Sequence, residues 1–263
     1  VGVGVALPCP VDPRDPDRIS EIVLPAWKGR SGLEALEEHF GVPVMMDNDA
    51  NLGALAERWW GAGRGVDDFA FVKVATGVGS GHFIGGHIYR GATGTAGEIG
   101  HVAIDPNGAP CICGLRGCLT TLVGSQALVA RASALAREHR KSPLAKKPVT
   151  IPAIVDAALA GDAVALKVVT QAAEHLGIAV AGMINLLNPT RVIIGGGMAR
   201  LNEVLLEPLR NAVRARTLVT SVHAAEIVTS ALGTKDVAMG AATLALQEAL
   251  ADPRYFEPVV AGP

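Results

Sequence analysis

The sequence predicts an α/β protein, and three observations support this fold class. Apolar runs of strand length, beginning with residues 1–7, alternate with longer segments whose apolar residues recur at helical spacing. From Asp68 onward apolar residues recur at every second position, which is typical of strands and indicates that a second domain begins there. With 49% hydrophobic and 18% charged residues, the 263-residue chain has the composition of a folded globular protein, long enough for one large domain or two ordinary ones.

The first 46 residues are expected to contain two strands and one helix. Residues 1–7 combine glycine, valine and alanine and predict a buried strand, and the proline-rich loop that follows is rigid and incompatible with a helix. Ser31 is the expected N-cap of a helix that ends at Phe40, because Glu34 completes a capping-box pattern with it. Residues 43–46 are apolar and predict the second strand.

Polar residues follow that second strand at four of five positions. They are Asp47, Asn48, Asp49 and Asn51, and they lead into a predicted helix at 50–60. Asp and Asn are favoured as helix N-caps, so capping explains one of them but not four. Because ligands collect at the carboxyl ends of strands in open α/β sheets, we expect the group to form part of a binding site.

The segment from Asp68 predicts a meander of three antiparallel strands, at 69–76, 81–85 and 87–91. Gly85 and Gly86 predict a hairpin turn between the last two strands. Gly77, Gly79 and Gly81 are expected to form a loop between the first two. A glycine-rich backbone of this kind can approach a phosphate group closely, and ordinary turn geometry explains it equally well.

The remaining elements alternate again between helices and strands. Helices are expected at 125–139, 151–160, 162–187, 202–217 and 237–250. Strands are expected at 191–194 and 226–230, and the first of these runs into Gly195, Gly196 and Gly197.

Residues 97–118 predict a metal site. They hold three of the chain's four cysteines and a histidine ten positions before the first of them. His101, Cys111, Cys113 and Cys118 supply one imidazole and three sulfurs, which completes a tetrahedral structural zinc site. The glycines around the cysteines let the backbone turn tightly enough to direct the sulfurs at one point. Two alternatives stay open here: a disulfide with a spare thiol, and unrelated buried thiols.

Taken together, these segments resemble the ROK family of sugar kinases and sugar-responsive repressors. The similar motifs are MDNDAN at 46–51, ATGVGSG at 75–81, GEIGH at 97–101 with the cysteines after it, RVIIGGGMA at 191–199 and VAMGAATLAL at 237–246. The resemblance implies an actin-like, ribonuclease H-like two-domain sugar kinase fold whose first domain is incomplete at its N-terminus. On this basis we expect the remainder of the first α/β domain at 1–66, a second α/β domain with the zinc knuckle at 67–236, and a C-terminal helix and tail at 237–263 that return to the first domain.

The resemblance also implies a sugar site. A hexose or amino sugar is expected to contact Asn48, Asp49, Glu98 and His101, and Asp49 would be the catalytic base in a kinase. If one nitrogen of His101 binds zinc, the other can face the sugar, so the metal would orient a binding residue.

The same resemblance implies nucleotide contacts at Gly77, Gly79, Gly195 and Gly196. ATP and Mg²⁺ would then be cofactors if the full-length protein is a kinase.

Two positions depart from the family pattern. Thr120 stands where the family usually has a glutamate that contacts the sugar, and Cys9 stands where relatives usually have glycine, which would narrow the pocket. The Asp-x-Gly-Gly-Thr turn that forms the family's first phosphate loop is absent from the sequence. We therefore expect this chain, as given, not to turn over ATP at a useful rate.

Two functions follow from these observations. The first is the sugar-sensing effector domain of a ROK transcriptional regulator, whose DNA-binding helix-turn-helix would precede residue 1. The alternative is an ATP-dependent sugar kinase of the ROK glucokinase type, truncated at its N-terminus. The run QEALADPRYFEP at 247–258 resembles the repressors more than the kinases. Because family members commonly pair, we expect a homodimer or homotetramer.

Charge and composition exclude some partners. The formal net charge of −2 gives no general attraction to nucleic acid or to anionic membranes. The apolar start of the chain is too short for a membrane span and lacks the basic flank of a signal peptide. Three clustered cysteines and one isolated cysteine fit a reducing compartment. The sequence therefore predicts a cytoplasmic protein that binds a small-molecule sugar and no membrane.

Overall fold

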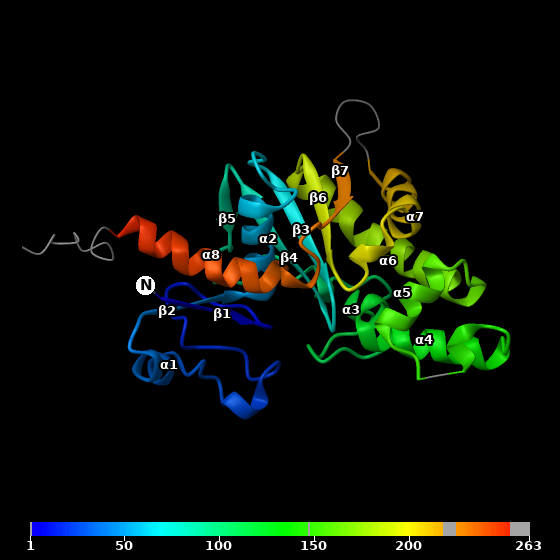
Figure 1. Ribbon diagram of the computed structural model, residues 1–263, viewed down its shortest axis with the longest axis horizontal. Helices are drawn as coiled ribbons and strands as arrows, with labels where there is room; N and C mark the ends of the chain where they lie inside the picture. The colour runs from blue at the N-terminus through cyan, green and yellow to red at the C-terminus, as the bar shows by residue number, and fades with distance from the viewer. Residues whose placement is uncertain (1, 147, 218–224, 253–263) are drawn as a thin grey trace, which may run out of the picture.

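A five-stranded mixed sheet forms the centre of the molecule (Figure 1). The computed structural model describes residues 2–146, 148–217 and 225–252. The sheet has the order β5-β4-β3-β6-β7, with β3 at Phe69–Val74, β4 at Val78–Ile84, β5 at His87–Tyr89, β6 at Arg191–Gly196 and β7 at Glu226–Thr229. Strands β3, β4 and β5 form the predicted antiparallel meander, whereas β6 and β7 run parallel to β3.

A second sheet has two parallel strands, β1 at Val3–Leu7 and β2 at Val44–Asn48. A short 3-10 helix at Pro25–Trp27 and helix α1 at Leu33–Phe40 lie between them in the chain. The last residues of the two strands, Leu7 and Asn48, are cross-strand partners. The loop after β1 therefore starts beside the polar residues at the end of β2.

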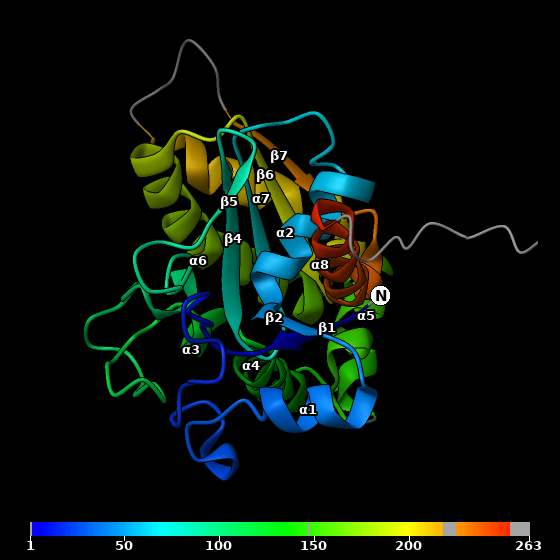
Figure 2. The same cartoon turned by 90° about the vertical axis from the view of Figure 1, so that its left-hand side faces the viewer.

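Helices cover both faces of the five-stranded sheet. Figure 2 shows α2 (Asp49–Trp60) and α8 (Asp236–Ala251) on one side of the sheet and α6 (Ala163–Leu187) on the other. Helices α3 (Thr120–Val123), α4 (Ser125–Glu138), α5 (Ile151–Leu159) and α7 (Glu203–Arg214) contribute to the same core as α6. Helix α8 also packs on β1, so it contacts both sheets.

Strand β3 divides its side chains between these two helix layers. Ala70, Val72 and Val74 belong to the core that contains α6, whereas Phe69 and Phe71 pack against α2 and α8. The division follows from the period of two along a strand. It also fixes where Lys73 points, because Lys73 lies on the same face as the two phenylalanines.

Two local predictions were wrong. Helix α1 begins at Leu33 with Gly32 as its N-cap, and not with Ser31. The Ser31 hydroxyl is buried and donates to Asp17 at 3.0 Å, although it also accepts from the Leu33 N–H at 3.3 Å. A hydrogen bond to a distant carboxylate thus decides the conformation of Ser31.

The second error concerns the glycine-rich loop between β3 and β4. Gly79 and Gly81 lie inside β4, and only residues 75–77 form the turn. A Cβ at Gly81 would lie 2.5 Å from the carbonyl oxygen of Ala50 in α2. The spaced glycines therefore allow α2 to pack closely on β4, which sequence spacing alone does not distinguish from a loop.

The long helix α6 is the only helix of the described residues that has the length and apolarity to cross a membrane. Of its most apolar window, 56% is buried in the protein core. Its contacts are those of a core helix. The second half of the C-terminal run at 247–258, residues 253–258, lies outside the described residues.

Candidate functional site

A cavity of about 710 Å³ lies where the end of β2 meets the β3–β4 turn and the segment that precedes α3. Seven of the predicted site residues line it: Asn48, Asp49, Gly77, Gly79, Glu98, His101 and Cys111. Gly195 and Gly196 do not. The structure thus brings the predicted sugar residues together with one of the two glycine segments.

The polar residues at the end of β2 and the start of α2 divide into two that are buried in the fold and two that line the cavity. Asp47 and Asn51 are buried, and their side chains hydrogen-bond each other at 2.9 Å. Asn48 caps α2 by accepting from Ala50 and Asn51 and also donates to the Cys9 carbonyl at 3.1 Å. Since a side-chain amide has two N–H donors, one remains for a ligand.

Asp49 is the first residue of α2, and its carboxylate forms an ion pair with Lys73. Both residues line the cavity. The sequence reasoning missed Lys73, although a lysine in the apolar strand FAFVKV is an available signal. It also missed Gln126 and Thr121, which line the cavity with Thr120 and give no pattern in the sequence.

Glu98 and His101 lie on either end of a short 3-10 turn that is held against β4. Gly97 at the start of this turn has φ +95°, and a Cβ there would lie 1.8 Å from the Ser80 carbonyl oxygen, so only glycine fits. Burial raises the pKa of Glu98; His101 opposes this, and the charge of Asp49 adds to it. The His101 Nε2 lies 3.7 Å from the Glu98 Oε2.

Cys9 does not narrow the cavity, contrary to expectation. Its side chain is buried in a small core with Leu7, Val11 and Ile19. The neighbouring prolines, Pro8 and Pro10, line the cavity instead.

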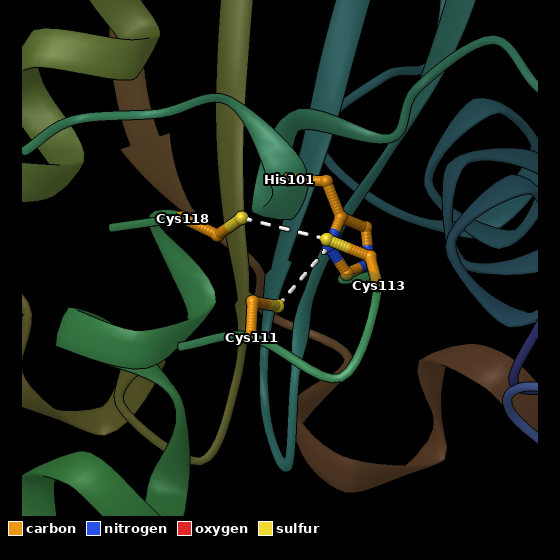
Figure 3. Close-up of side chains that lie close together, drawn as sticks. All are labelled: His101, Cys111, Cys113 and Cys118. Carbon is orange, nitrogen blue, oxygen red and sulfur yellow. Dashed lines mark hydrogen bonds between the residues drawn. The ribbon is translucent and has the colours of Figure 1, made fainter. Parts of the chain in front are cut away.

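His101 also belongs to a compact cluster with the three cysteines (Figure 3). One ligand atom from each residue lies within 4.8 Å of the others. The Cys111 Sγ lies 3.5 Å from the His101 Nδ1, and the Cys113 Sγ lies 3.6 Å from the Cys118 Sγ. These atoms converge on one point between the turn at 99–101 and the start of α3.

The spacing of these atoms fits a tetrahedral metal ion. A zinc ion with bonds of about 2.3 Å to sulfur and about 2.0–2.1 Å to nitrogen requires S···S edges near about 3.8 Å and N···S edges near about 3.6 Å. The Cys113–Cys118 and Cys111–His101 separations, 3.6 and 3.5 Å, are close to these edges. A disulfide would bring two sulfurs to about 2.05 Å, and all four cysteines are free thiols.

Burial and the neighbouring thiols disfavour the ionised form of Cys118. Burial raises the pKa of Cys118 to about 12, and Cys113 and Cys111 contribute in the same direction. A cation at the centre of the cluster would stabilise the thiolates that such packing otherwise disfavours.

The ROK family profile matches residues 1–248. This chain belongs to the ROK family. A glucokinase of Halalkalibacterium halodurans is 36% identical over 254 residues, covering 94% of this chain and 77% of the relative. A putative xylose repressor of Caldicellulosiruptor is 33% identical and covers 97% of this chain, which spans 65% of the repressor's length. ROK relatives of both kinds, kinases and repressors, are thus similar to this chain.

A ROK glucokinase from Streptomyces griseus, solved in complex with glucose and AMPPNP, superimposes with a TM-score of 0.86 at 31% identity. The alignment covers 94% of this chain and 81% of that one. The predicted fold class is confirmed: the chain has the actin-like, ribonuclease H-like fold of ROK sugar kinases.

Proposed function

We propose that the cavity binds a hexose or amino sugar through Asn48, Asp49, Glu98 and His101. The observation that carries this proposal is that four polar residues, separated by up to 53 positions in the chain, line one cavity. Its volume lies in the range of about 300–1,000 Å³ that is usual for small-molecule sites. Carboxylate, amide and imidazole groups supply the mixture of acceptors and donors that sugar hydroxyls require.

Each group has a distinct part in this proposal. The Asp49 carboxylate and Glu98 accept hydrogen bonds from hydroxyl groups, whereas the free N–H of Asn48 donates one. His101 binds zinc through Nδ1, on the side of Cys111, and directs Nε2 toward Glu98. Zinc, bound to His101, Cys111, Cys113 and Cys118, would fix the orientation of the imidazole.

The role that fits this chain best is the sugar-sensing domain of a ROK transcriptional regulator. The pairing of Asp49 with Lys73 supports it, because the carboxylate that a kinase would need to contact the sugar hydroxyl is already engaged by an ammonium group. Thr120, which lines the cavity, offers a hydroxyl and no charge at its position. In this role a separate helix-turn-helix would bind DNA, and the domain would form dimers or tetramers.

Titration calorimetry with glucose, mannose, N-acetylglucosamine and xylose tests the sugar site. At least one sugar should bind the parent chain, and Glu98→Gln should weaken that binding by about ten- to a hundredfold, the cost of removing a charged hydrogen-bond partner. Glu38→Gln, an exposed carboxylate on α1, is the matched control. Equal affinities for the parent and the Glu98 variant would exclude Glu98 from the site.

A second candidate function is an ATP-dependent sugar kinase. It is favoured by the position of Asp49 in a cavity that Gly77 and Gly79 also line, which places a possible base near a possible phosphate segment. ATP and Mg²⁺ would be its cofactors, and Gly195 and Gly196 would contact the nucleotide outside the cavity. Phosphoryl transfer depends mainly on positioning and charge neutralisation, and a base contributes only about 10²–10⁴-fold.

A coupled assay of ADP release separates the two functions. It is run with each of the four sugars, on this 263-residue chain and on a form extended upstream. The sensor proposal predicts no sugar-dependent ADP release from either form. If either form released ADP in the presence of sugar, and Asp49→Asn abolished that release, the kinase function would be established.

A further inference from the structure

Lys73 is the last residue on the face of β3 that packs on α2 and α8. Phe69 and Phe71 precede it on that face and are almost completely buried. The Lys73 side chain is 20% exposed, and that of its partner Asp49 is 22% exposed. The pair is thus partly withdrawn from water, where an ion pair interacts more strongly than at an open surface.

A second carboxylate, that of Asp236, lies close to the same lysine. Asp236 is the first residue of α8 and is 4% exposed. One of its oxygens accepts from the Val237 N–H at 2.7 Å, and the other, Oδ2, has no hydrogen-bond partner in the described part of the chain. A Cβ on Gly195 would lie 3.2 Å from this Oδ2, and Gly195 is the direct cross-strand neighbour of Lys73.

The charges in this region are coupled. Burial raises the pKa of Asp236, the charge of Lys73 opposes that rise, and the charge of Asp49 adds to it. Asp49 also acts on Glu98 across the cavity. Asp49 therefore interacts with two further carboxylates, those of Asp236 and Glu98, and with the ammonium group of Lys73. Without it, Asp49 would face two like charges.

We propose that Lys73 is a positioning residue of the sugar site, which holds the Asp49 carboxylate through Oδ2 and leaves Oδ1 to accept a sugar hydroxyl. The inference rests on the proposed sugar-binding function. Lys73 offsets the repulsion that Glu98 and Asp236 exert on Asp49. It acts through Asp49, and its own ammonium needs no contact with the sugar.

The first test is calorimetry with a sugar that the parent binds, chosen from glucose, mannose, N-acetylglucosamine and xylose. Lys73→Met should weaken binding by tenfold or more, and Lys73→Arg, which keeps the charge, should recover at least part of the loss. The control is Lys167→Met, which removes an exposed lysine of α6 on the other side of the sheet and should leave the affinity unchanged. An affinity of Lys73→Met within twofold of the parent would overturn the inference.

A double variant distinguishes electrostatic positioning from a merely structural role. In the Lys73→Met background, Asp236→Asn removes one of the charges that repel Asp49, so it should restore affinity by at least threefold. A lysine that only fills space gives no such recovery. Folded variants in which neither Asp236→Asn nor Lys73→Arg improves on Lys73→Met would overturn the proposal.

If the parent chain binds none of the four sugars, the proposed function is refuted, and the inference about Lys73 needs a measurement that does not depend on sugar binding. Urea unfolding of Lys73→Met, Asp49→Asn and the double variant then tests the pair itself. The inference requires that the two changes be non-additive, with at least a twofold coupling in the unfolding equilibrium constant. Additive effects would show that Lys73 does not hold Asp49.

Discussion

Arg90 donates through both Nε and Nη2 to one carboxylate oxygen of Asp47, at 2.9 and 2.6 Å. Asp47 is almost completely buried at the end of β2, whereas Arg90 directly follows β5. The other carboxylate oxygen accepts from the Asn48 N–H and the Asn51 side chain. The ion pair therefore links the two-stranded sheet to the edge of the five-stranded sheet, next to the cavity.

Arg90→Ala should lower the free energy of unfolding by about 1.5–3 kcal/mol, because it leaves a buried carboxylate without its counter-ion. Urea unfolding measures this. Arg14→Ala removes an exposed ion pair with Asp12 and should cost clearly less stability than Arg90→Ala. Adding Asp47→Asn to Arg90→Ala should recover part of the loss. An Arg90 variant as stable as the parent would contradict this account.

The metal prediction concerns stoichiometry. Elemental analysis should find about one zinc per chain, and Cys113→Ser should lose it together with thermal stability, because only three ligands remain. Cys9→Ala removes the thiol outside the cluster and should keep the metal. A stable, metal-free parent would refute the zinc site, as would a Cys113 variant that retains full occupancy.

The pH prediction concerns Glu57 in α2, which is fully buried. Burial raises its pKa above the ordinary 4.5; hydrogen bonds from Ser230 and Ala62 oppose this, and the charge of Asp236 adds to it. The folded protein therefore binds the proton of this carboxyl more tightly than the unfolded chain does. The protonated carboxyl stabilises the fold at pH values below the pKa of the unfolded state, and this contribution is lost as pH rises through the pKa of the folded state. Each pKa unit corresponds to about 1.4 kcal/mol.

Glu57→Gln removes this titration. The stability of the variant relative to the parent should therefore improve as pH rises from about 4.5 toward neutrality, the window above the unfolded pKa. Urea unfolding across that range measures the difference. The exposed control Glu38→Gln should show a flat difference. A flat profile for Glu57→Gln as well would mean that Glu57 titrates alike in the folded and unfolded states.

The charge of the cavity predicts its preference among sugars. Glu98 and Asp49 are both acidic, and the ammonium of Lys73 is already paired with Asp49. A phosphate group would meet a net negative surface, which costs affinity. Glucose 6-phosphate should therefore bind at least about tenfold more weakly than glucose in calorimetry, a difference of about 1.4 kcal/mol. The neutral 6-O-methylglucose controls for size, and tighter binding of the phosphate would contradict the charge argument.

The sequence alone determined those features in which the decisive interactions are local. The strand and helix periods, the hairpin at Gly85 and Gly86, and the extent of α6 depend on neighbouring residues only. The metal cluster was also predictable from local sequence, because three of its four residues, Cys111, Cys113 and Cys118, lie within eight positions. The MDNDAN and GEIGH segments identified the family and most of the cavity's polar residues.

Only the tertiary structure decided which polar residues reach the cavity and which hold the fold together. Asp47 and Asp49 look equivalent in sequence. Asp47 forms a buried ion pair with Arg90, however, whereas Asp49 forms an ion pair with Lys73 in the cavity. Gly79 and Gly81 proved to be the place where α2 approaches β4. The physical reason is that charge pairing and close packing depend on residues brought together from distant positions, which no local pattern encodes.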